Sequence, residues 1–200
     1  FLRGVFILAP RNMTKAAGFY NSLMKLDQPA IVIEPLNGYR TKEKMPSNLG
    51  KLETSIGEVD IIKEGKDLTI ISYGSTLNIV DEVGKKLLDY DIDCEIIDLQ
   101  SLIPFDISSQ IKKSVEKTNR ILIVDEDMPG GASSYILQEL LNTQKIYNKL
   151  DSEPYLLTAK EHRPPYGSDG DYASKPSFED IFEKVYEIMN EVNPNKYNNI

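Results

Sequence analysis

Three consecutive carboxylates, Asp125-Glu126-Asp127, are the first residues whose types and spacing could do chemistry. They follow a short apolar run and precede Pro129-Gly130-Gly131, a position typical of a strand end that leads into a helix. Carboxylates there could hold a divalent cation, stabilise a helix dipole or meet a basic partner. Because they would repel a phosphate, they argue against a nucleotide-binding loop.

The single histidine lies in the most distinctive loop of the sequence, which runs from Glu161 to Tyr172 and is rich in turn-forming residues. A histidine flanked by carboxylates could act as a general base. The sequence places no serine or cysteine nucleophile with it, so we interpret His162, Arg163 and Tyr166 as an interface loop.

Two other motifs resemble cofactor sites. Ser72-Tyr73-Gly74-Ser75 closes a strand and opens a helix, but it lacks the glycine spacing of a dinucleotide-binding loop, so we expect a tight turn. Gly170-Asp171 precedes Asn198-Asn199 at about the interval of the Mg²⁺-binding motif of thiamine-diphosphate enzymes. Tyr172 replaces the motif's second glycine and no strand precedes it. We therefore expect no catalytic, cofactor-binding or metal-binding residue in this chain.

Composition narrows the class of partner. The 200 residues carry a net charge of -8 at pH 7, and the pI is near 4.8. This excess of negative charge argues against nucleic acid as a partner and favours a partner with a basic protein surface. Cys94 lies in an apolar run and is expected to be a buried thiol. No stretch is long and apolar enough for a membrane span, and a cytoplasmic location is the default expectation.

Short β-branched runs alternate with amphipathic segments from residue 51 onward, which predicts a three-layer α/β/α domain with a mostly parallel five-stranded sheet. Asp106 is expected to cap a helix whose Ile107, Ile111 and Val115 face the core. The expected strands are Glu58–Ile62, Leu68–Ser72, Glu95–Leu99, Ile121–Val124 and Tyr155–Thr158. The expected helices are Leu77–Tyr90, the one begun by Asp106, Ala132–Tyr147 and the one that follows Ser177.

Residues 1–50 show a different pattern from that of residues 51 onward. They predict a partial βαβ unit, with strands Gly4–Leu8 and Ala30–Ile33 around a helix over Thr14–Leu26, followed by a charged linker rich in turn formers. Two strands and one helix make too small a core, so we expect the unit to belong to a larger sheet and the chain to be a piece of a longer protein. Residues 193–200 are expected to form a flexible tail.

Several motifs, in order and spacing, resemble the beta subunit of thiamine-diphosphate-dependent 2-oxoacid dehydrogenases. They are Asn37-Gly38-Tyr39-Arg40, Ile56-Gly57-Glu58-Val59, Glu64 to Gly74, Glu95 to Asp106, Lys117 to Arg120, Asp125-Glu126 with Gly130-Gly131, and Leu150-Asp151. The resemblance implies that residues 1–50 end a pyrimidine-binding domain plus linker, and that residues 51–192 form a transketolase-type C-terminal domain.

The resemblance also implies a function. Such enzymes decarboxylate a 2-oxoacid, for example 2-oxoisovalerate, on thiamine diphosphate with Mg²⁺ and transfer the acyl group to lipoyl. The catalytic residues would lie outside this chain. The implied roles of this part are dimerisation, contact with the alpha part and docking of the basic subunit-binding domain of the dihydrolipoyl acyltransferase. Asp151, Glu126 and Asp127 are the expected docking residues.

Three points stay open at this level. The family's potassium site usually has an acidic residue where Leu26 stands. The charged loop from Arg40 to Lys51 and the Gly-Ser-Asp-Gly-Asp-Tyr segment from Gly167 to Tyr172 resemble bacterial forms in which the alpha and beta parts are fused. The alternatives are the C-terminal region of transketolase or 1-deoxyxylulose-5-phosphate synthase, or a non-enzymatic acidic docking module.

Overall fold

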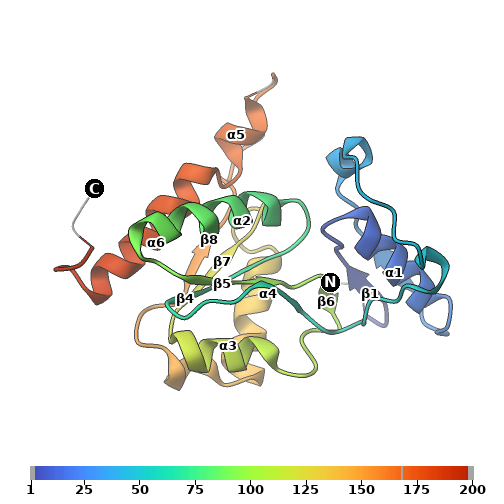
Figure 1. Ribbon diagram of the computed structural model, residues 1–200, viewed down its shortest axis with the longest axis horizontal. Coiled ribbons are helices and arrows are strands. Elements are labelled where there is room, and N and C mark those ends of the chain that lie inside the picture. The colour runs from blue at the N-terminus through green and yellow to red at the C-terminus, as the bar shows by residue number, and fades with distance from the viewer. Residues whose placement is uncertain (1–2, 168, 198–200) are drawn as a thin grey trace.

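A five-stranded sheet forms the centre of the computed structural model, which describes residues 3–167 and 169–197 (Figure 1). Its strand order is β3-β5-β4-β7-β8, and every neighbouring pair is parallel except β3 with β5. The predicted mostly parallel sheet is therefore confirmed. The strands are β3 (Asp60–Lys63), β4 (Leu68–Ser72), β5 (Cys94–Asp98), β7 (Ile121–Val124) and β8 (Tyr155–Leu157).

Helices cover both faces of this sheet, which confirms the three-layer prediction (Figure 1). One face packs against α2 (Thr76–Leu87) and α6 (Phe178–Val192), and the other against α3 (Gln110–Thr118) and α4 (Ala132–Gln138). Side chains alternate between the two faces along a strand, so a strand buried on both sides must be apolar throughout. In β4, for example, Ile70 belongs to the first core and Ile71 to the second.

The N-terminal part forms a smaller sheet beside the larger one (Figure 1). The strands β1 (Phe6–Leu8) and β2 (Ala30–Val32) are parallel and are joined by α1 (Met13–Leu23), as the βαβ prediction requires. A third strand that the sequence did not predict, β6 (Ser101–Ile103), pairs antiparallel with β1. Since β6 directly follows β5, the small sheet contains chain from both sides of the boundary predicted near residue 50.

The helix predicted to start at Asp106 starts instead at Gln110. Asp106 still caps it, because its carboxylate accepts hydrogen bonds of 2.9 Å from the backbone N–H groups of Gln110 and Ile111. The intervening residues form a turn, and this turn leaves Ile107 64% exposed. The prediction that Ile107 faces the core was wrong, whereas Ile111 and Val115 are buried as expected.

Three segments near the C-terminal end also differ from the prediction. The helix expected over Ala132–Tyr147 is α-helical only as far as Gln138. A π-helical turn (Glu139–Thr143) and a 3₁₀ turn (Ile146–Lys149) follow it. A short helix that was not predicted, α5, spans Gly170–Ser174. Within the expected flexible tail, Tyr197 is only 5% exposed and packs edge-on against Tyr186. Residues 198–200 lie outside the described residues.

Candidate functional site

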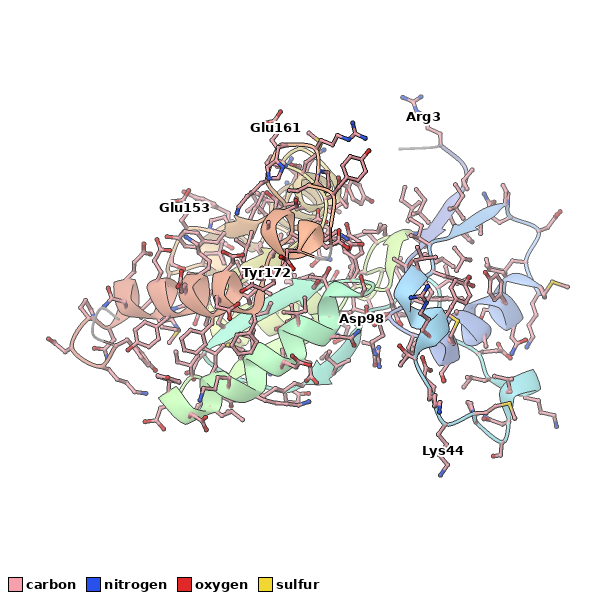
Figure 2. All side chains as sticks on the ribbon, turned by 90° about the horizontal axis from the view of Figure 1, so that it is seen from above. Arg3, Lys44, Asp98, Glu153, Glu161 and Tyr172 are labelled. Atoms are coloured by element: carbon pink, nitrogen blue, oxygen red, sulfur yellow. The ribbon has the colours of Figure 1, made fainter. Side chains whose placement is uncertain are left out.

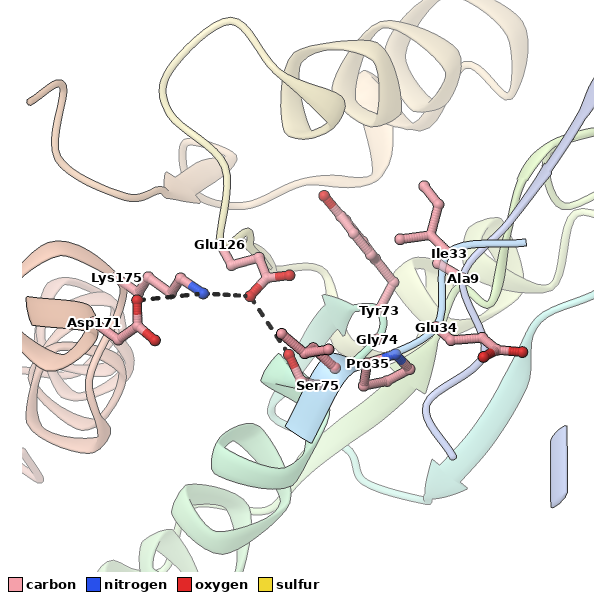
Figure 3. A pocket seen from close by; sticks show the side chains of 11 residues that line it. Ala9, Ile33, Glu34, Pro35, Tyr73, Gly74, Ser75, Glu126, Asp171 and Lys175 are labelled. Atoms are coloured by element: carbon pink, nitrogen blue, oxygen red, sulfur yellow. Dashed lines mark hydrogen bonds and ion pairs between the residues drawn. The ribbon is translucent and has the colours of Figure 1, made fainter. Parts of the chain in front are cut away.

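A cleft of about 310 Å³ lies at the carboxyl ends of strands from both sheets (Figure 3). The small sheet contributes Ala9 and Glu34, β4 contributes the Tyr73-Gly74-Ser75 turn, and β7 contributes Glu126. The chain leaves β4 for β5 on one side and leaves β7 for β8 on the other. Ligands of open α/β sheets bind outside the strand ends at such a reversal, so this cleft is the candidate site.

Asp125 holds two walls of the cleft together. Its carboxylate is fully buried and accepts hydrogen bonds from the Tyr73 hydroxyl (2.5 Å) and from the backbone N–H groups of Asp127 (3.0 Å) and Ser133 (2.7 Å). Burial, together with the nearby Asp125 charge, raises the pKa of Tyr73. Tyr73 therefore keeps its proton and donates to Asp125, which joins the turn after β4 to the loop after β7.

Among the described residues that line the cleft, Lys175 is a cation that lies beside several carboxylates (Figure 3). The Lys175 ammonium lies 3.1 Å from a Glu126 oxygen and 3.8 Å from an Asp171 oxygen. The Ser75 hydroxyl donates to the same Glu126 oxygen at 3.4 Å. These side chains are partly exposed, so each ion pair contributes under about 1 kcal/mol to stability. The acidic rim favours a cationic or neutral polar group over a phosphate.

Glu34 adds a further carboxylate to this rim. Its two oxygens accept hydrogen bonds from the Tyr20 hydroxyl, at 2.6 Å, and from the Tyr39 hydroxyl. These bonds lower the pKa of Glu34, and the hydrogen bond to Glu34 is the main reason why the pKa of Tyr20 rises to about 12. Glu34 is therefore ionised at neutral pH, and it anchors the segment that leads out of β2.

A cluster of four charges lies where the two sheets meet, and Figure 2 labels one of them, Asp98, between the two parts of the molecule. The Arg11 guanidinium, from the loop between β1 and α1, lies 2.6 Å from Asp98 and 2.8 Å from Asp60. Lys15 of α1 lies 2.9 Å from the same Asp60 oxygen. Burial raises the pKa of Asp98 to about 6, although Arg11 opposes this shift. The cluster ties the N-terminal part to the larger sheet.

The predicted docking residues do not come together. Glu126 and Asp127 follow β7, whereas Asp151 precedes β8 and pairs with Arg120, just before β7, at 2.6 Å. Because β7 and β8 are parallel, the two groups lie at opposite ends of the strands, and the four residues of β7, roughly 13 Å of strand, lie between them. Asp151 also lines a shallow groove with Tyr147, Asn148, Leu150, Ser152, Glu153 and Pro154.

The predicted interface loop is exposed. Arg163 donates a hydrogen bond to the Tyr166 hydroxyl, and its guanidinium lies 5.2 Å from the Tyr166 ring centroid. The Nδ1 atom of His162 lies 3.0 Å from the carbonyl oxygen of Arg163. Tyr166 is 88% exposed. The three side chains are accessible to a partner, and their role at an interface stays a prediction.

The motif-like pair Gly170-Asp171 lies in a short helix in the structure. Among the described residues, no group of three or more His, Cys, Asp or Glu side chains is arranged to hold a metal ion. Gly170 lies inside the start of α5 and Asp171 pairs with Lys175, so the motif-like pair has an ordinary structural role; Asn198 and Asn199 lie outside the described residues. Cys94 is fully buried, as predicted, and burial raises the pKa of its thiol.

The fold and the cleft together define a class of protein, an α/β/α domain whose candidate site lies at the carboxyl edge of its sheet. Residues 57–174 match the family model described as "Transketolase, C-terminal domain". The chain therefore belongs to the transketolase C-terminal domain family. A solved structure titled "Split gene transketolase, inactive beta4 tetramer" has the same fold, with a TM-score of 0.71 at 19% identity over 93% of this chain and 57% of that one.

Named relatives confirm the resemblance to beta subunits of 2-oxoacid dehydrogenases. The chain is 33% identical to the "Pyruvate dehydrogenase E1 component subunit beta" of Mesostigma viride over 93% of its own length and 56% of the relative's. For the subunit of the same name from Chlorokybus atmophyticus, the identity is 31% over 91% and 53%. The chain thus spans about half the length of these relatives.

Two findings bear on location. In the part of the chain that the structure describes, none of the helices has the length and apolar character needed to cross a membrane. Relatives from Arabidopsis thaliana and Oryza sativa are described as chloroplastic. The cytoplasmic location expected from the sequence therefore stays a prediction.

Proposed function

We propose that this chain is a section of the beta part of a thiamine-diphosphate-dependent 2-oxoacid dehydrogenase, an oxidoreductase that decarboxylates a 2-oxoacid and transfers the acyl group to lipoyl. The observation that carries the proposal is the similarity to pyruvate dehydrogenase beta subunits over more than nine-tenths of the chain. Pyruvate and branched-chain oxoacids such as 2-oxoisovalerate are the two candidate substrates.

The role that we propose for this section is assembly. It would contribute to a dimer of beta parts, contact the alpha part and dock the basic subunit-binding domain of the acyltransferase. The net charge of -8 supports a basic partner, because opposite charge speeds encounter and orients it. Asp151 stays the first candidate for docking, since it is 43% exposed and lies beside a groove.

The chain alone is expected to show no decarboxylation of pyruvate or 2-oxoisovalerate with thiamine diphosphate and Mg²⁺. The reason is that the chain spans only 56% and 53% of the two beta subunits that it resembles, and we propose that the catalytic residues lie in the remaining part and in the alpha part. Decarboxylation is measured as the release of ¹⁴CO₂ from carboxyl-labelled substrates. Adding the complementary section of the beta part and the alpha part is expected to restore turnover. Turnover by the chain alone would contradict the placement of the catalytic residues, and failure of the full assembly on every 2-oxoacid would contradict the proposed function.

Replacing Asp151 with Lys is expected to weaken binding of the acyltransferase's subunit-binding domain by about tenfold or more. The change removes an attractive charge and places a cation beside Arg120, which lies 2.6 Å from Asp151. Isothermal titration calorimetry at two salt concentrations measures the effect, because a charge-driven loss shrinks as salt rises.

Glu126→Lys is the matched control, since Glu126 is a comparably exposed carboxylate at the opposite end of the strands. Its affinity is expected to stay within about twofold of the unchanged protein. If Glu126→Lys weakens binding and Asp151→Lys does not, the docking surface lies at the cleft edge. If neither variant changes the affinity, neither carboxylate docks the partner.

A further inference from the structure

We propose that the open edge of β8 binds an extended, positively charged segment of a partner polypeptide as an additional strand. This surface is separate from the cleft and goes beyond the assembly role proposed above. β8 is the last strand of the five-stranded sheet and pairs only with β7 among the described residues. Sheet edges of this kind are used for recognition by strand addition, in which main-chain hydrogen bonds hold the incoming peptide.

The hydrogen-bonding pattern identifies the groups on the open edge. The Leu157 carbonyl accepts from Asp125, and the Ala159 N–H donates to Asp127, so both of these residues face β7 and its extension. Backbone groups alternate in direction along a strand. Leu156 and Thr158 therefore direct their N–H and C=O groups outward, and within the described residues these groups make no backbone hydrogen bond.

Both ends of this edge are limited. Pro154 has no N–H group, so it offers only its carbonyl oxygen, and at the far end the Lys160 N–H is already bonded to the Ser174 carbonyl of α5 at 2.9 Å. Between these limits there is room for about four residues of an added strand. A short edge of this kind resists uncontrolled strand pairing and needs a further source of affinity.

Negative charge beside β8 provides this additional affinity and favours a positively charged partner. The Tyr155 hydroxyl donates to Glu191 at 2.8 Å, and this bond, with burial and the nearby charges of Glu191, Glu187 and Glu153, raises the pKa of Tyr155 to about 12. Three carboxylates therefore lie around the start of β8. Among the described residues, Lys184 lies beside these carboxylates: it pairs with Glu187 and lies 5.1 Å from the Tyr155 ring centroid, so Glu153 and Glu191 supply most of the unpaired negative charge.

Figure 2 shows Glu153, one of these carboxylates, at the outer surface of the molecule on the side away from the N-terminal part. Asp151 lies two residues earlier in the same segment and lines the neighbouring groove. Lysine or arginine side chains at alternate positions of an added strand would all point to one face, where they can meet these carboxylates.

The probe is a fluorescein-labelled heptapeptide that alternates lysine and valine and begins and ends with lysine. It is expected to bind the protein at low salt, as measured by fluorescence anisotropy. Thr158→Pro removes an outward N–H that takes no part in the pairing with β7, and it is expected to weaken binding about tenfold. Thr158→Val keeps this N–H and is the matched control, with affinity unchanged.

Two further arms keep the test decisive if Thr158→Pro disturbs the fold. The same peptide with methylated backbone nitrogens is expected to bind the unaltered protein about tenfold more weakly. The Glu187→Gln/Glu191→Gln variant is expected to weaken binding about fivefold at low salt and less at high salt. The proposal is overturned if methylation and Thr158→Pro leave the affinity within twofold. It is also overturned if a glutamate-valine peptide binds equally well, or if only Asp151→Lys abolishes binding.

Discussion

Replacing Arg11 with Met is expected to lower the free energy of unfolding by about 3–5 kcal/mol, the cost typical of removing one partner from a buried ion pair. Arg11 lies 2.6 Å from the fully buried Asp98. Without Arg11, the favourable partners left to Asp98 among the described residues are the Gln100 N–H and the more distant Lys15. Urea unfolding measures the loss as a shift of the midpoint at unchanged slope.

The control for Arg11→Met is Lys15→Met, which removes a cation from the partly exposed Asp60 and is expected to cost under about 1 kcal/mol. The double variant Arg11→Met/Asp98→Asn should recover part of the loss, because it removes the unpaired charge as well. A loss below about 1 kcal/mol for Arg11→Met would show that the cluster does not hold the two parts together.

Replacing Asp125 with Ala is expected to cost about 3 kcal/mol or more, since three donors lose their acceptor in a buried site. Tyr73→Phe removes only one of these hydrogen bonds and is expected to cost about 1 kcal/mol. Thermal unfolding followed by circular dichroism compares the two variants. Equal losses would mean that Asp125 acts only through Tyr73 and does not organise the loop after β7.

The strands of the large sheet could be predicted because their signal is local. A strand buried on both faces is an unbroken apolar run, and Ile121–Val124 was predicted with the bounds that the structure shows. The start of α6 was equally clear, since the Ser177 hydroxyl accepts from the Asp180 N–H and the Asp180 carboxylate accepts from the Ser177 N–H. Short-range chemistry decides both elements.

Elements that depend on distant partners could not be predicted. β6 has only three residues and no alternating pattern, and its strand character comes from pairing with β1, more than 90 residues away. The candidate site shows the same limit. Tyr73 and Glu126 were noted in the sequence and Lys175 was not, and nothing local indicates that the three line one cleft. Asp151 and Glu126 were both expected docking residues, and only the strand direction shows that they lie at opposite ends of the sheet.

The crossing of β6 into the small sheet also limits how this chain can be recombined. The residues that add a third strand to the N-terminal sheet belong to the C-terminal part of the sequence, between β5 and α3. A cut at residue 50 would leave β1 with one neighbour and Ser101–Ile103 with none. A C-terminal part taken from another protein would therefore have to supply a strand that pairs with β1. For the same reason, substitutions in β1 and β6 have to be compatible with each other.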